Sequence, residues 1–327
     1  MVSVIIPFHN RFKVINDTIR SVYQQSYLNY ELILVDDSSE IIFSETAQCQ
    51  EWQKKFSRKN INFSVIRNSK NLGSGLSRQR GLNKAKGIYV AFLDSDDCWS
   101  EDFLEKSVEV HEKSPQIAAT YCTCFYTDGK LRSKTDLDFR EICSTLIRHY
   151  RVWQTGALLW KKKYTSKWKN LKSNQDSLFE FDSGLINDYI KHVDGPILKI
   201  NKDTGYHTHH RVKKAQNYLN ICVIYSYYLK HLSKINSQVF STFFLAIVCH
   251  LKLSKLLYLI ISRQLLFPND YYRAVCKDNY LHPKVRVFNF IHHKSPVLVP
   301  LLKLILSLEK FILLRIHNFL YKAFYQK

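Results

Sequence analysis

Three aspartates within four positions follow an apolar run in the first third of the chain. The run covers residues 88–93, and the acids are Asp94, Asp96 and Asp97. In an extended backbone, residues two apart point the same way, so Asp94 and Asp96 can place two carboxylates side by side at a strand end. Such a pair repels itself unless a cation lies between its oxygens, and Mg²⁺ or Mn²⁺ prefers oxygen ligands that it shares with phosphates. A solvated acidic turn is the alternative interpretation.

The segments around these acids alternate between strand and helix patterns. Strands are expected at residues 2–6, 31–35, 63–66 and 88–93, and helices at residues 12–25, 42–56 and 76–86. This alternation indicates an α/β fold, an open and mostly parallel sheet with helices on both faces. Ligands of such sheets bind beyond the carboxyl ends of the strands. The residues that follow strand ends here are Pro7, Asp36, Asp37, Asp94 and Asp96.

The pattern beyond Asp97 is looser and changes near residue 210. Another helix is expected after Ser100, strands at residues 117–127, 153–160 and 189–200, and a helix at residues 176–186. From residue 213 onward the pattern is helical almost throughout. We therefore predict two domains, a catalytic domain at residues 1–210 and a basic helical region at residues 211–327.

The formal charge of +20 lies mostly in that second region. Residues 206–327 hold 18 Lys or Arg against 3 Asp or Glu, which leaves 30 against 25 for the rest of the chain. The basic residues accompany Leu, Ile, Phe and Tyr, so an anionic membrane surface is a better partner than nucleic acid, and no nucleic acid is expected. Residues 301–324 form an amphipathic pattern with Lys303, Lys310 and His317 every seven positions. That helix either lies in a bilayer interface or packs on the catalytic domain.

Cysteine usage and the first residues point to the cytosol. The eight cysteines form no C-x-x-C motif, and the strand-like spacing of Cys122 and Cys124 puts them on one face rather than at a metal. No signal peptide is expected, because the apolar start is too short. Neither residues 239–249 nor residues 301–324 contain an uninterrupted run of about 20 apolar residues, the length that a transmembrane helix needs. The expected location is cytoplasmic, either free or peripheral on the inner face of the cell membrane.

Four motifs together resemble family 2 glycosyltransferases. They are Val-Ser-Val-Ile-Ile-Pro at 2–7, Glu-Leu-Ile-Leu-Val-Asp-Asp-Ser-Ser at 31–39, Asn-Leu-Gly at 71–73 and Gly-Ile-Tyr-Val-Ala-Phe-Leu-Asp-Ser-Asp-Asp at 87–97. The resemblance is strong over about the first 110 residues, patchy to about 210 and absent beyond. It implies the GT-A fold, a Rossmann-like sheet, and an inverting enzyme that uses a nucleotide-sugar donor.

The resemblance also implies roles on the donor side of the site. The second Asp after the second strand, Asp37, would contact the nucleotide base. The D-x-D motif supplies Asp96 as the metal ligand, for Mn²⁺ or Mg²⁺, with Asp94 on the ribose or the metal. The family often has Arg-Asn where this chain has Arg78 and Gln79, so Arg78 would meet the diphosphate and Gln79 is a departure. The implied donor-site residues are Pro7, His9, Asp37, Arg78, Asp94, Ser95 and Asp96.

The general base and the acceptor wall are implied by a second set of residues. The family supplies its base from a Glu-Asp or Gln-Asp pair that opens a helix, which nominates Asp176 here, with Glu180 one turn later as the rival. The alternative for Asp176 is an ordinary N-terminal helix cap. Trp153 and Gln154 would form part of the acceptor wall, although Trp153 also suits a core position. The histidines that follow the last expected strand form either a phosphate-facing loop or a solvated basic loop; they are His207, His209 and His210.

The expected activity is transfer of a hexose from a UDP-linked donor to a hydroxyl of a glycan or lipid-linked acceptor, as in bacterial lipopolysaccharide or capsule synthesis. A phosphatase of the haloacid dehalogenase type fits less well, because its D-x-D lies on the first strand. A nucleotidyltransferase needs a Gly-rich loop after the first strand, and residues 7–11 contain no Gly. A non-catalytic membrane-surface scaffold on a transferase fold remains the main alternative.

Overall fold

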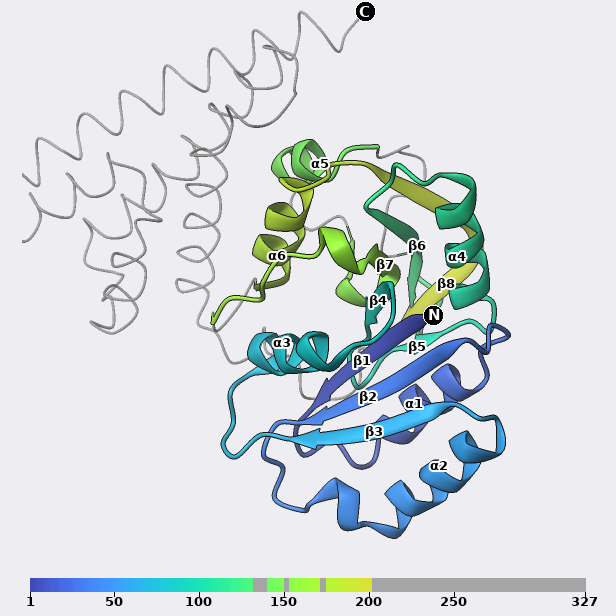
Figure 1. The fold of residues 1–327 in the computed structure, drawn as a ribbon, viewed down its shortest axis with the longest axis vertical. Coiled ribbons are helices and arrows are strands. Elements are labelled where there is room, and N and C mark those ends of the chain that lie inside the picture. The colour runs from blue at the N-terminus through green and yellow to red at the C-terminus, as the bar shows by residue number, and fades with distance from the viewer. Residues whose placement is uncertain (132–139, 150–152, 171–174, 202–327) are drawn as a thin grey trace, which may run out of the picture. The chain divides into compact units, whose positions relative to one another are not determined.

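A computed structural model describes residues 1–131, 140–149, 153–170 and 175–201 (Figure 1). All of them belong to one compact unit of the chain, Met1–His207. The predicted helical region at 211–327, its amphipathic helix and the histidines His207, His209 and His210 lie outside the described residues. The predicted domain boundary therefore stays a prediction.

The N-terminal half has the alternating order that the apolar pattern predicts. It consists of β1 (Val2–Phe8), α1 (Ile15–Tyr23), β2 (Tyr30–Asp36), the 3₁₀ turn η1 (Phe43–Glu45), α2 (Ala47–Arg58), β3 (Asn62–Arg67), α3 (Ser74–Lys84) and β4 (Tyr89–Phe92). The first strand is longer than expected and includes Pro7, which lies opposite Val35 in the ladder to β2.

The second half agrees with the predicted pattern less closely. It consists of β5 (Cys98–Trp99), α4 (Phe103–Lys113), β6 (Ala119–Tyr126), α5 (Ile142–His149), η2 (Thr155–Ala157), β7 (Leu158–Lys161), η3 (Lys162–Tyr164), α6 (Gln175–Gly184) and β8 (Ile190–Ile200). The strand expected at residues 153–160 is a 3₁₀ turn followed by the short strand β7. Helix α5 was not expected. Its first turn is held by a residue distant in sequence, since the Cys143 N–H donates to Asp188 Oδ1 at 2.6 Å.

The described strands form one sheet in the order β3-β2-β1-β4-β7-β6-β8-β5. The strands β3, β2, β1 and β4 are parallel to one another, as predicted. Strand β7 is antiparallel to both β4 and β6, β8 is parallel to β6, and β5 is antiparallel to β8. The sheet is therefore mixed, with its parallel part at the N-terminal end of the chain.

Helices cover both faces of the parallel part of the sheet, so β1, β2 and β4 are buried throughout, while the edge strand β3 is only partly buried. Alternate side chains of β1, from Val2 to Phe8, join an apolar core with residues of α1 and α2. On the other face, α3 lies against Ile5 at Gly81, where a Cβ atom would come within 2.4 Å of Ile5 Cγ2. Because β1, β2 and β4 are parallel, their carboxyl ends lie at the same edge of the sheet, and the predicted donor-site residues follow these ends.

Candidate functional site

Two arginines from different segments contact the acids that follow β4. Arg78 on α3 donates to Asp94 Oδ1. Arg11, in the loop after β1, lies 2.7 Å from Asp96 Oδ2 and donates to Ser95 Oγ at 3.2 Å. The sequence motifs point to Arg78 but give no sign of Arg11. The D-x-D motif is therefore bracketed by two guanidinium groups, which offset the mutual repulsion of its carboxylates.

The three acids differ in exposure. The side chain of Asp94 is 42% exposed and that of Asp96 only 8% exposed. Burial raises the pKa of Asp97 well above its ordinary value, and the neighbouring charges of Asp94 and Asp96 raise it further. Asp97 also accepts a hydrogen bond from the Asn201 N–H at 3.3 Å. Asp94 is thus the member of the cluster that is open to a ligand, while Asp97 is buried.

The donor set of this cluster suits a hard divalent ion. Within the described ranges, no three His, Cys, Asp or Glu side chains are grouped as a closed metal site. Mg²⁺ and Mn²⁺ commonly bind through one or two carboxylates and complete their coordination with water and substrate phosphates. The carboxylates of Asp94 and Asp96 fit that pattern, and they are the residues that would hold such an ion.

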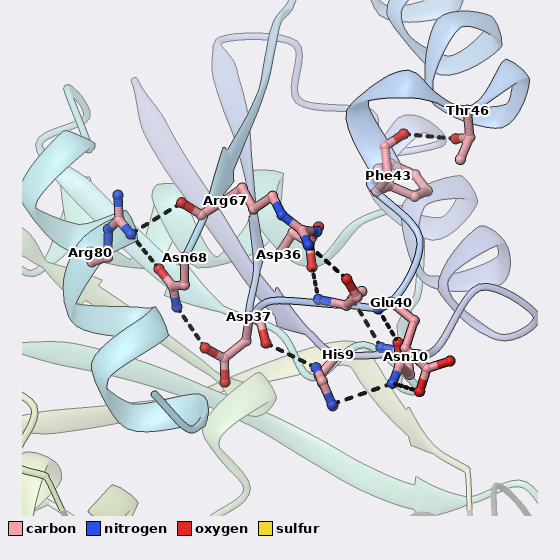
Figure 2. A network of polar contacts seen from close by, with 11 residues as sticks. His9, Asn10, Asp36, Asp37, Glu40, Phe43, Thr46, Arg67, Asn68 and Arg80 are labelled. Carbon is pink, nitrogen blue, oxygen red and sulfur yellow. Dashed lines mark hydrogen bonds and ion pairs between the residues drawn. The ribbon is translucent and has the colours of Figure 1, made fainter. Parts of the chain in front are cut away.

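The carboxylate of Asp37 accepts three hydrogen bonds within the protein. It accepts from Asn68 Nδ2 at 2.7 Å and from the backbone N–H groups of Leu72 and Gly73 at 2.8 Å each (Figure 2 shows Asp37 with Asn68). Gly73 has a φ of +84°, which few residues other than glycine adopt, and it directly precedes α3. Asp37 therefore anchors the turn that leads into the helix carrying Arg78. Its predicted contact with a nucleotide base stays a prediction.

His9 connects the loops that follow β1 and β2. Its Nδ1 lies 2.9 Å from the backbone oxygen of Asp37, and its Nε2 lies 3.4 Å from Asn10 Nδ2 (Figure 2). A carbonyl oxygen only accepts, so Nδ1 carries the hydrogen and Nε2 accepts from the Asn10 amide. The half-buried imidazole ring is therefore held in one orientation at the sheet edge, and its predicted place in the donor site stays a prediction.

The residues behind this edge form a second polar layer. Asp36 accepts from Arg67 Nη1 at 2.5 Å and from the Ser39 N–H at 2.8 Å. Arg80 Nη1 donates to Asn68 Oδ1 at 2.6 Å, which orients the amide that holds Asp37 (Figure 2). These contacts support the loops of the predicted donor site.

The candidate base lies on α6, whose start is tied to α3. Asp176 is the second residue of α6 and half-buried, so it lies inside the first turn rather than at the cap position before the helix. Its neighbour Gln175 donates from Nε2 to Ser74 Oγ at 2.5 Å. Gly75 permits this approach, since a Cβ atom there would lie 2.3 Å from Gln175 Oε1. The rival base Glu180 is on the same helix and 4% exposed.

The predicted acceptor-side residues lie further along the sheet. Trp153 is 2% exposed, and its ring centroid is 5.7 Å from that of Tyr121 on β6. Gln154 directly precedes η2 and is half-buried. Trp153 therefore occupies the core position that the sequence analysis named as its alternative, and the acceptor role of both residues stays a prediction.

Comparison with curated proteins identifies relatives named for polysaccharide synthesis. The chain is 36% identical over 130 residues to TuaG of Bacillus subtilis, named for teichuronic acid biosynthesis, with 39% of this chain and 49% of TuaG covered. It is 36% identical over 118 residues to the amylovoran biosynthesis glycosyltransferase AmsB of Erwinia amylovora, with 34% of this chain and 36% of AmsB covered. The chain thus spans at most about half the length of these curated relatives.

Solved structures of similar fold are more distant in sequence. TarS 1–349 of S. aureus, in complex with UDP-GlcNAc, superposes with a TM-score of 0.58 at 19% identity, covering 78% of this chain and 71% of that one. The mannosyltransferase PcManGT of Pyrobaculum calidifontis, in complex with GDP-Man and Mn²⁺, gives a TM-score of 0.54 at 13% identity, covering 95% and 86%. At such identities the likeness shows the fold alone, and it confirms the GT-A expectation.

The family assignment comes from a match over half of the chain. The family model described as glycosyl transferase family 2 matches residues 3–172. That stretch includes all of β1 but its first residue, the acids after β4 and the two arginines that contact them. The chain belongs to glycosyl transferase family 2.

Proposed function

We propose that this protein is an inverting glycosyltransferase that moves a hexose from a UDP-linked donor to a hydroxyl of a glycan or lipid-linked acceptor. The observation that carries this proposal is the meeting of Arg11, Arg78, Asp94 and Asp96 at one sheet edge, from three separate segments. The family assignment and the UDP-GlcNAc named with TarS support the donor class. The names of TuaG and AmsB support a polysaccharide acceptor.

Each donor-side residue has a role that its surroundings suit. The oriented ring of His9 offers a stacking face for the base, beside Pro7 and Asp37. Arg78 and Arg11 supply positive charge for the diphosphate, since guanidinium groups match phosphate oxygens well. Asp94 and Asp96 would hold Mn²⁺ or Mg²⁺, and the Mn²⁺ named with PcManGT is consistent with this. When bound, the ion would supply positive charge to the departing diphosphate.

The proposed reaction is a direct displacement at the anomeric carbon. The acceptor oxygen forms a bond to that carbon as the bond to the phosphate oxygen breaks, and the nucleoside diphosphate leaves with the electron pair. Asp176 takes the proton of the acceptor hydroxyl. A positioned general base contributes about 10²- to 10⁴-fold, which is roughly 3–5 kcal/mol. Trp153, Gln154 and Glu180 are proposed on the acceptor side.

A second candidate function is a non-catalytic scaffold on the same fold. The pairing of both D-x-D carboxylates with arginines favours it, because ion pairs of this kind can be structural. Of the described helices, none has both the length and the apolar character needed to cross a bilayer. For either candidate, we propose a cytoplasmic location, with a peripheral position on the inner membrane face depending on residues 211–327.

The test uses the full-length chain with a panel of nucleotide sugars and Mn²⁺. Donor hydrolysis, transfer and thermal protection by UDP are measured with and without EDTA. Asp96→Ala should lose metal-dependent UDP protection and turnover together, whereas Asp176→Asn should keep UDP binding and lose at least about 100-fold in turnover. Asp17→Asn, at an exposed position on α1, is the control and should match the wild type.

Three outcomes would reject parts of this proposal. Full turnover in Asp176→Asn with loss in Glu180→Gln would move the base to Glu180. Binding of UDP without any turnover across the panel would favour the scaffold. Indifference of the wild type to every nucleotide sugar and divalent ion would reject the donor site itself.

A further inference from the structure

The arginine predicted to face the diphosphate is buried against an aromatic ring. The side chain of Arg78 is 6% exposed, and its guanidinium carbon lies 4.8 Å from the ring centroid of Trp168. Its Nε is buried and has no hydrogen-bond partner among the described residues. The position of this guanidinium therefore depends on two contacts, its ion pair with Asp94 and the face of the Trp168 ring.

Trp168 is itself fixed from three sides. Its ring stacks on Phe179 of α6, with centroids 4.2 Å apart and planes 8° apart. The ring of Phe92, at the end of β4, meets it edge-on at 5.1 Å. Its backbone N–H donates to Gln79 Oε1 on α3 at 2.8 Å. The indole is 3% exposed, so it has little freedom to turn.

These contacts bring together the three elements that carry the proposed chemistry. Phe92 lies two residues before Asp94, and Phe179 lies three residues after Asp176 on the same helix. Gln79, where the chain departs from the family's usual residue, holds the Trp168 backbone. One side chain thus contacts the strand that leads to the D-x-D motif, the helix of the diphosphate arginine and the helix of the candidate base.

We infer that Trp168 is a positioning residue: its indole holds the Arg78 guanidinium in place for the donor diphosphate and links it to α6 through Phe179. This inference rests on the proposed function, because it takes Arg78 as a phosphate ligand. A desolvated cation–π contact contributes about 1–2 kcal/mol, which corresponds to roughly 5- to 30-fold in affinity. Trp168→Leu is therefore expected to weaken UDP binding by that factor, and Trp168→Phe, which keeps a ring face, is expected to restore most of it.

The decisive experiment is a double-mutant cycle on the full chain, with UDP and Mn²⁺ as the probe. Trp168→Leu is compared with the wild type, and again in an Arg78→Lys background. If Trp168 acts through Arg78, its replacement by Leu should lower the UDP affinity at least about fivefold in the wild-type background. In the Arg78→Lys background, the same replacement should lower the UDP affinity at most about twofold. Equal losses in both backgrounds would show a general structural role and overturn the inference.

Controls separate this inference from the proposed function and from misfolding. Trp52→Leu removes a similarly buried indole on α2, and it should lower thermal stability without changing UDP affinity. If Trp168→Leu does not fold, the same cycle is run with Gln79→Ala, which frees the Trp168 backbone. If the wild type binds UDP, and Trp168→Leu and Gln79→Ala bind UDP with the same affinity as the wild type, the inference is overturned while the proposed function stands. A wild type that binds neither UDP nor GDP overturns the proposed function with it.

Discussion

Replacement of Asp37 by Asn tests how the start of α3 is held. The carboxylate is 4% exposed and accepts three hydrogen bonds, from Asn68, Leu72 and Gly73. Asn keeps one acceptor oxygen, which can serve Asn68 and Leu72. Its amide nitrogen then faces the Gly73 N–H, so two donors oppose each other in a buried place.

The magnitude follows from those contacts. A hydrogen bond to a charged group is worth about 1.5–3 kcal/mol, and leaving a buried donor unsatisfied costs about 1–3 kcal/mol. We therefore expect Asp37→Asn to lower the free energy of unfolding by about 2–4 kcal/mol. Since domains have a total stability of about 5–15 kcal/mol, this loss is readily measured.

The assay is urea unfolding of the full chain followed by circular dichroism, with UDP affinity measured in parallel. The control is Asp17→Asn, because the Asp17 side chain is 66% exposed and its ion pair with Arg20 is also exposed. Exposed pairs contribute little, so the control should stay within about 0.5 kcal/mol of the wild type. Asp37→Asn with wild-type stability and lost UDP affinity would refute the anchoring role and leave Asp37 as a ligand contact alone.

Two further predictions concern packing and pH. Gly81→Ala places a Cβ atom 2.4 Å from Ile5 Cγ2. The overpacking should cost about 1–3 kcal/mol, which exceeds the helix-propensity gain of up to about 1 kcal/mol, so the melting temperature should fall. An unchanged or higher melting temperature would contradict this prediction. Burial lowers the pKa of His111 to about 4, so the folded chain should lose up to about 3 kcal/mol as the pH falls from about 6.5 to about 4. His111→Gln should lack that loss when unfolding at pH 4.5 is compared with pH 7. Burial raises the pKa of Asp188 to about 6, which acts in the opposite direction in the same window, so the informative quantity is the difference between His111→Gln and the wild type.

The N-terminal half of the fold was predictable because its signals are local. Runs such as residues 2–6 and 31–35 are apolar and rich in strand formers, and both strands are buried throughout. Helix α5 was not predicted, and its start depends on Asp188, which lies 45 residues away in sequence and accepts from the Cys143 N–H. Strand β5 has two residues, and among the described strands it pairs with β8 alone. Elements that depend on distant partners leave little trace in the local pattern.

In the candidate site too, some residues are visible in the local sequence pattern and others depend on distant partners. The aspartates could be found because they directly follow apolar strands. Arg11 and Trp168 could not, because an ion pair and a stacked ring are defined by the folded neighbours Asp96 and Phe179. Gln79 was noticed only as a departure from the family, and its contact with the Trp168 backbone now gives it a physical reason.

The arginine partners of the D-x-D motif have a consequence for the thermodynamics of donor capture. Because Arg11 and Arg78 are already paired with Asp96 and Asp94, the proposed donor and its ion would meet charges that are already compensated. Under the proposed function, donor capture would be an exchange of partners, in which the ion pairs with the carboxylates and the guanidinium groups, still held beside them, pair with the phosphates instead. Because the number of opposite-charge contacts changes little on binding, the affinity for the nucleotide sugar should depend only weakly on the salt concentration.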